Sequence, residues 1–264
     1  MTASQALRAG LRLAFSRSWP ALALFAAGAG ELFAASAVPL LLFGSLVSGD
    51  VRVLWAGAVG LGTGWVLCRV ARAVILYAAL GPGGPATALR ALGYFALSSA
   101  LELTARLWWW TGLVASAVAF VKQPGAGASL SLSVTLSGGL LLGLFVTVWA
   151  DLALARSASR GEPFSRSLAE AARALAERPG APVLIVLVTG LLRWSVEVGA
   201  STFAAVAGPL APSGVALVPR ALAGLVAALA WAVLELGRLF ALQALDRETP
   251  VLAAVPVDAP GSAG

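Results

Sequence analysis

Long, continuous apolar runs are the feature that most constrains what this chain can fold into. A helix needs roughly 20 apolar residues to cross about 30 Å of hydrocarbon, and the chain contains six runs of that length. A membrane β-barrel would instead show alternating segments of about ten residues. We therefore predict an all-α, polytopic transmembrane bundle of about six helices. The predicted spans are residues 19–47, 53–76, 98–121, 129–150, 181–207 and 219–242.

The composition supports lipid as the solvent around these runs. Of the 264 residues, 59% are hydrophobic and 11% are charged. Soluble domains average about 45–50% apolar and about 25% charged residues, so this chain has too little charge to cover a surface that faces water. We therefore expect membrane lipids to be partners of this chain.

The basic residues predict how the spans are oriented. Cytoplasmic loops of membrane proteins collect Lys and Arg. Arg52, Lys122 and Arg220 flank the spans on one side, whereas thirteen basic residues lie on the other. The thirteen are Arg8, Arg12, Arg17, Arg69, Arg72, Arg90, Arg156, Arg160, Arg166, Arg173, Arg178, Arg238 and Arg247. This asymmetry predicts that both ends of the chain lie in the cytoplasm.

The residue usage also indicates a compartment. The excess of Arg over Lys, together with abundant Ala, Gly and Val, is typical of a GC-rich bacterial genome, so we expect the bacterial cytoplasmic (inner) membrane. A net charge of +6 could also indicate nucleic acid. The basic residues come in short loops rather than along one soluble face, and we therefore predict no nucleic-acid partner.

Three short segments with an amphipathic pattern precede the first, third and fifth runs: residues 4–17, 86–97 and 165–178. In the clearest, Leu168, Ala171 and Leu175 share one face, and Leu7, Leu11 and Phe15 repeat that pattern in the first. Such helices can lie in the headgroup plane. The alternative is that each segment extends the following span into the cytoplasm. Ser167 and Glu170 have the spacing of a capping box.

These pieces predict a unit of amphipathic helix plus helical hairpin that is used three times. The segment DLALARSASRGEP at 151–163 resembles RLFALQALDRETP at 238–250. We expect one transmembrane domain over residues 1–249 and a disordered tail over 250–264. The spacings Gly60 to Gly64 and Gly139 to Gly143 match the GxxxG pattern of close helix contacts.

Charges within the predicted spans are the candidate functional residues, because a charge in hydrocarbon is costly. Glu102 and Arg106 lie four residues apart in one run, and Arg193 and Glu197 in another. Each pair either neutralises itself and serves insertion, or handles a substrate, lipid or ion. Glu31 has no basic neighbour in sequence, so we expect it to be protonated or to pair with a cation such as Arg193 from another helix.

Other polar and aromatic residues have plainer interpretations. Five charges lie near the cytoplasmic ends of the spans, where we expect them to reach the surface by snorkelling. They are Arg69, Arg72, Asp151, Glu235 and Arg238. The three consecutive tryptophans 108–110 cannot share one helix face, so at least one should meet lipid or a partner.

The sequence contains no pattern that carries a known chemistry. It has no histidine, its only cysteine is Cys68, and it lacks HExxH, GxSxG, Walker and CxxC motifs. We therefore predict no catalytic residue, no metal site, no cofactor and no enzymatic activity.

The segment GEPFSRSLAEAARAL at 161–175, placed before paired spans, resembles a broad group of bacterial six-helix membrane proteins. That group is similar to the membrane domain fused to some glycerophosphodiester phosphodiesterases. The resemblance covers most of the chain as architecture, and no catalytic residue carries over because the hydrolase domain is absent. It implies an accessory or lipid-associated role in the membrane.

The expected function is therefore that of a non-catalytic integral membrane protein. It would scaffold a protein partner in the membrane or organise lipid. The alternative is a transporter or channel subunit that uses the intramembrane charges Glu31, Glu102, Arg106, Arg193 and Glu197.

Overall fold

The computed structural model describes residues 1–30, 51–81, 86–123, 125–210 and 217–248, and the regular secondary structure of these residues is entirely α-helical. An unlabelled helix over residues 18–30 lies between α1 and α3 in the chain. The labelled helices are α1 (Ala3–Ser16), α3 (Val51–Leu80), α4 (Ala86–Lys122), α5 (Ala126–Arg160), α6 (Phe164–Glu177), α7 (Gly180–Leu210) and α8 (Leu217–Glu248).

Four helices are long and apolar enough to cross a membrane, which confirms the prediction of a helical chain with several candidate spans. Their apolar stretches are Trp55–Leu80, Ala126–Arg160, Gly180–Ala207 and Ala221–Arg247. They correspond to the second, fourth, fifth and sixth predicted runs. Most of the first run, 19–47, lies outside the described residues.

The third predicted run, 98–121, is helical as part of α4, but α4 is not among these four candidate spans. Glu102, Arg106 and the tryptophans 108–110 are less hydropathic than the aliphatic residues around them, and they dilute the apolar character of this helix. Residues 86–97 do not form a separate helix either. They are the first turns of α4, as the alternative interpretation of this segment anticipated.

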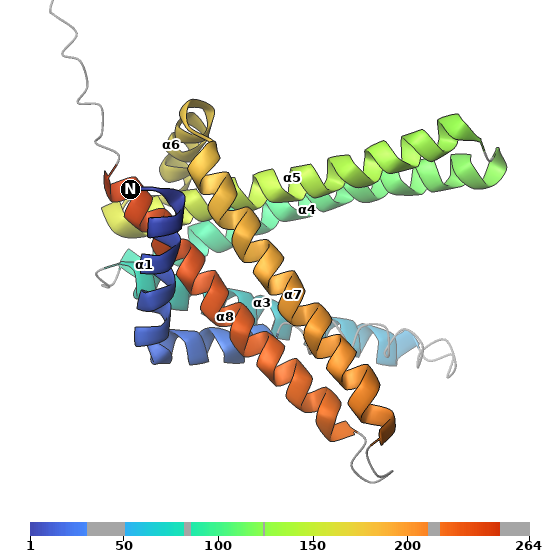
Figure 1. Ribbon diagram of the computed structural model, residues 1–264, viewed down its shortest axis with the longest axis horizontal. Helices are drawn as coiled ribbons and strands as arrows, with labels where there is room; N and C mark the ends of the chain where they lie inside the picture. The colour runs from blue at the N-terminus through green and yellow to red at the C-terminus, as the bar shows by residue number, and fades with distance from the viewer. Residues whose placement is uncertain (31–50, 82–85, 124, 211–216, 249–264) are drawn as a thin grey trace, which may run out of the picture.

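The helices spread from a common end (Figure 1). The pairs α4–α5 and α7–α8 each lie side by side, and they point in different directions. We call the common end the base: it contains α1, α6 and the carboxyl ends of α3, α5 and α8. There α1 packs on α8, and α6 packs on α5. The parts of the helices away from the base are called the arms.

The hydrophobic core lies in the base. Leu76, Leu154 and Leu239 are fully buried there, whereas Trp55 and Leu140 in the arms are 68% and 76% exposed. Only 6% of the most apolar window of α5 is buried inside the protein, against 44% for α8. An apolar helix with so little burial needs another apolar environment, and this is what lipid supplies.

The two short helices differ in detail from their predictions. α1 begins with a capping box in which Thr2 and Gln5 bond each other's backbone. The capping box predicted at Ser167 and Glu170 is wrong, because α6 begins earlier, at Phe164 after Pro163. Ser167 is therefore inside the helix, where it is buried.

α1 docks on α8 through small residues. Ala6, Gly10 and Ala14 face α8, whereas Phe15 is 73% exposed. A methyl group on Gly10 would collide with the backbone of Gly237 and Ala241, so the two helices approach each other at backbone distance. This small-residue contact is typical of helices that associate in membranes, where large apolar side chains can face lipid instead.

The predicted GxxxG contacts are not the ones that the described structure uses. A methyl group on Gly60 or Gly64 would meet no neighbouring atom within 4 Å. The same holds for Gly143. The indole of Trp109 from α4 packs against Gly139 instead. The glycine pattern alone therefore did not locate the close helix contacts.

Candidate functional site

Ion pairs between helices form the first feature of interest. Arg69 of α3 donates to Glu102 of α4 at 2.8 Å between Nη2 and Oε2. Arg72, one turn further along α3, pairs with Glu235 of α8. Each of these pairs joins two different helices, so the charges tie the hairpins together at the boundary between base and arms.

A third pair links α5 to α8. The Nε of Arg238 lies 2.9 Å from Oδ2 of Asp151, which is 6% exposed. Glu235 is 5% exposed. A buried carboxylate is tolerated only with a compensating partner, and each of these acids has a guanidinium beside it.

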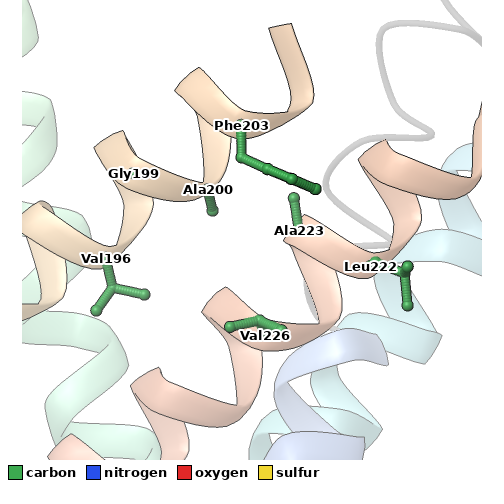
Figure 2. Close-up of a pocket in the computed structure, with 7 residues that line it drawn as sticks. All are labelled: Val196, Gly199, Ala200, Phe203, Leu222, Ala223 and Val226. Atoms are coloured by element: carbon green, nitrogen blue, oxygen red, sulfur yellow. The ribbon is translucent and has the colours of Figure 1, made fainter. Parts of the chain in front are cut away.

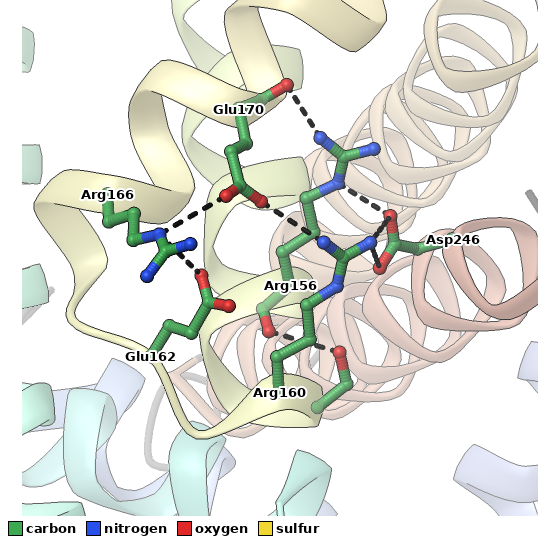
Figure 3. A network of polar contacts seen from close by, with 7 residues as sticks. Arg156, Arg160, Glu162, Arg166, Glu170 and Asp246 are labelled. Atoms are coloured by element: carbon green, nitrogen blue, oxygen red, sulfur yellow. Dashed lines mark hydrogen bonds and ion pairs between the residues drawn. The ribbon is translucent and has the colours of Figure 1, made fainter. Parts of the chain in front are cut away.

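A denser network closes the base (Figure 3). The carboxylate of Asp246 on α8 accepts a hydrogen bond from Nε of Arg156 at 2.6 Å and another from Nη2 of Arg160 at 3.2 Å. Arg156 also donates to the backbone carbonyl of Glu170 at 2.6 Å, and Arg160 contacts the Glu170 carboxylate at 3.1 Å. Two arginines of α5 thereby hold α6 and the end of α8 at once.

The outer edge of this network is exposed. Arg166 of α6 lies 3.6 Å from Glu162 and 3.4 Å from Glu170, and its side chain is 68% exposed. Ser157 of α5, which is buried, donates to the carbonyl of Glu162 and accepts from Tyr77 of α3, both at 2.7 Å. The base is thus a hydrogen-bonded unit that includes α3, α5, α6 and α8.

These positions correct the snorkelling prediction. Arg72, Asp151, Glu235 and Arg238 pair inside the protein, and Arg69 pairs with Glu102, whose side chain is 38% exposed. Their partners come from other helices, and sequence spacing carries no information about such partners. The prediction treated each span as alone in lipid, where a charge near a helix end has only the surface to reach.

The candidate charges within the spans have different outcomes. Glu102 pairs with Arg69 of α3, whereas the side chain of Arg106, its predicted partner, lies outside the described ones. Arg193 and Glu197 form the predicted i,i+4 pair at 2.7 Å, with side chains 50% and 47% exposed. Glu31 lies outside the described residues, so its pairing with Arg193 stays a prediction.

Trp231 of α8 connects two of these groups. The guanidinium of Arg72 lies 4.5 Å from the centre of its ring, and that of Arg193 lies 5.3 Å away. Gly28 leaves space for the same indole, since a methyl group there would collide with it. The cation–π contacts join α3, α7 and α8 at one point. Sequence reasoning placed Trp231 within a span but not in this role.

An apolar groove between α7 and α8 is the second feature (Figure 2). It has a volume of about 530 Å³. Its lining consists of Val196, Gly199, Ala200, Phe203, Leu222, Ala223 and Val226. Gly199, Ala200 and Ala223 leave the space because they are small. No lining side chain carries a polar atom, so the groove can accept hydrocarbon but offers no group for acid–base chemistry.

The tryptophans 108–110 divide as their spacing predicted. Trp108 and Trp110 are 67% and 53% exposed, while Trp109 packs on Gly139 of α5. Two indoles of α4 therefore face outward from the pair α4–α5.

Asp246 is the network residue that the sequence analysis missed. It lies in the last turn of α8, where the helix dipole disfavours a negative charge. An acid at such a position is a signal that a cation lies nearby, and here two arginines of α5 supply it.

The described residues contain no cluster of three or more His, Cys, Asp or Glu side chains that could hold a metal ion. Comparisons with models of protein families, with curated proteins and with solved structures gave no match to this chain. The fold thus defines a class, an all-helical chain with several candidate membrane spans, and its site consists of a charged base and an apolar groove.

Proposed function

We propose that this chain is a non-catalytic integral protein of the bacterial inner membrane that organises lipid. In this proposal six helices cross the membrane, both ends lie in the cytoplasm, and the chain is built from three units of short helix plus hairpin. The base lies on the cytoplasmic side and the arms lie in hydrocarbon.

The groove between α7 and α8 is the observation that carries this proposal. Both helices are candidate spans, and in this proposal the groove opens toward lipid. Its volume of about 530 Å³ falls in the range of about 300–1,000 Å³ that is usual for small-molecule sites. An acyl chain fits the purely apolar lining, because it needs no hydrogen-bond partner.

The rigid base and the diverging arms support the same role. Buried ion pairs between helices resist rearrangement, since separating them leaves charges unpaired. The arms expose large apolar side chains, such as Leu140 and Val121 at 76% and 80%. A protein of this shape would hold lipid chains between fixed hairpins.

The test compares two glycines of α7. Gly199 lines the groove, Gly190 does not, and a methyl group at either would meet no neighbouring atom within 4 Å. Protein purified in mild detergent is loaded with a phospholipid that carries a photoreactive group in its acyl chain, irradiated and digested. Labelled peptides are expected to contain groove residues such as Phe203 or Val226.

Gly199→Leu should abolish most of this labelling by filling the groove, and Gly190→Leu should leave it unchanged. Labelling spread evenly over all helices, or equal labelling of both variants, would contradict the proposal.

The half-exposed pair Arg193–Glu197 favours the alternative of a transporter or channel subunit. It lies within the candidate span Gly180–Ala207, where an exposed charge is costly unless it serves a polar pathway. Reconstituted vesicles would decide this: solute or ion flux that Glu197→Gln alters would support transport over lipid organisation.

A further inference from the structure

The outward face of α1 is a second exposed surface, after the groove between α7 and α8. Ala6, Gly10 and Ala14 dock α1 on α8. Arg8, Arg12 and Phe15 follow at i, i+4 and i+7, which places them on the stripe opposite the docked one. All three are exposed, and Phe15 is 73% exposed. Trp19, just beyond the break at Arg17, is 76% exposed.

The described residues do not balance the charge of this face. Residues 1–30 contain no Asp or Glu. Within the described part of the chain, neither Arg8 nor Arg12 makes an ion pair, whereas Arg166 and Arg193 have carboxylate partners. Arg17 is also engaged, because it donates to the carbonyl of Ala79 at 2.9 Å. Arg8 and Arg12 thus remain as an exposed cationic pair.

The neighbouring side chains indicate where the counter-charge lies. Exposed Phe and Trp beside Arg are typical of helices whose apolar side enters the boundary between headgroups and acyl chains. The positive charge of a guanidinium group attracts the phosphates of anionic lipids. A surface that is both basic and aromatic matches an anionic lipid layer better than it matches water.

We propose that the α1 face formed by Arg8, Arg12 and Phe15, together with the exposed Trp19 that follows it in the chain, binds the headgroups of anionic phospholipids. This inference goes beyond the proposed function and does not depend on what the groove between α7 and α8 holds. Arg8 and Arg12 supply the attraction, and Phe15 and Trp19 set the depth of α1 at the membrane surface.

The test uses the full-length protein, delipidated in a mild detergent and titrated separately with phosphatidylglycerol and phosphatidylcholine of the same acyl chains. Bound lipid is counted by native mass spectrometry. The wild type should prefer phosphatidylglycerol. Arg8→Gln with Arg12→Gln should weaken phosphatidylglycerol binding about 30-fold, as expected for two cations near a membrane surface. Binding of phosphatidylcholine should be unchanged, and high salt should shrink the preference.

Arg166→Gln is the matched control. It removes an exposed arginine from the same base, but one that Glu162 and Glu170 already neutralise. It should leave the lipid preference intact. Arg8→Lys with Arg12→Lys keeps the charge and should retain most of the preference, and it also serves if the glutamine variant folds poorly. The proposal is overturned if the glutamine variant keeps the wild-type preference, if the lysine variant loses it, or if Arg166→Gln reduces it equally.

Discussion

Single charged residues decide how the helices of this protein are held together. Asp246 is the clearest case, because its side chain is 2% exposed and serves both Arg156 and Arg160. The contacts of Arg166 with Glu162 and Glu170 have the same chemistry at the exposed edge of the base. Burial separates them: a buried pair becomes costly when one member is removed, whereas an exposed pair contributes little.

We expect Asp246→Asn to lower the free energy of unfolding by about 3–5 kcal/mol, because the buried guanidinium of Arg156 loses its carboxylate, whereas Arg160 keeps that of Glu170. Arg166→Gln should change it by less than about 1 kcal/mol, since that side chain is 68% exposed at the edge of the base. The measurement is unfolding of the purified protein in mixed micelles of mild and denaturing detergent. Equal stability of the two variants would show that the network of the base is not structurally important.

At the scale of elements, the short helices α1 and α6 pack against the long helices of the base. α1 meets α8 through Gly10 and Gly237, and α6 meets α5 through the bond of 2.7 Å from the Trp149 indole to the carbonyl of Leu168. Neither helix is long enough to span a membrane. Their stability therefore depends on what they pack against, as is usual for short helices.

Alanine substitutions of two glycines should change stability in opposite directions. Gly10→Ala places a methyl group against the backbone of α8 and should cost about 1–3 kcal/mol. Gly93→Ala, in α4, meets no neighbouring atom within 4 Å and should stabilise by up to about 1 kcal/mol through helix propensity. The same unfolding assay measures both. A stabilised Gly10→Ala variant would disprove the close contact between α1 and α8.

At the scale of the whole molecule, the two ends of the bundle differ in chemistry. The base is packed and rich in ion pairs, and the arms are apolar and exposed. This polarity, together with the distribution of Arg, favours an orientation with the base in the cytoplasm. In that orientation the arms reach across the hydrocarbon, and the junction of α4 and α5 faces the other side.

Reporter fusions test this orientation. Green fluorescent protein, which folds in the cytoplasm, should fluoresce at either end of the chain. Alkaline phosphatase, which requires the periplasm, should be active when inserted after Gln123, between α4 and α5. The same insertion after Pro179, between α6 and α7, should be inactive. The reverse pattern would contradict this orientation and would show that the base does not lie in the cytoplasm.

The sequence alone was sufficient for features that depend on neighbouring residues. The second, fourth, fifth and sixth apolar runs form candidate spans, because length and hydropathy are local properties of a segment. The pair Arg193–Glu197 followed from helical periodicity in the same way.

Only the tertiary structure decided which residues meet between helices. The partner of Glu102 is Arg69 and that of Asp246 is Arg156, and neither pairing follows any sequence spacing. The groove between α7 and α8 likewise exists only where two helices bring Gly199 and Ala223 together.

The apolar pattern of α1 did not show which residues dock it on α8. The prediction placed Leu7, Leu11 and Phe15 on the apolar face of a helix that can lie in the headgroup plane; Phe15 is 73% exposed, whereas Leu11 packs over Gly237. In lipid, large apolar side chains are stable outside, and close packing selects the small residues Ala6, Gly10 and Ala14. Hydropathy therefore determined that the chain has helices suited to a membrane, while side-chain size and long-range charge pairing determined how those helices pack.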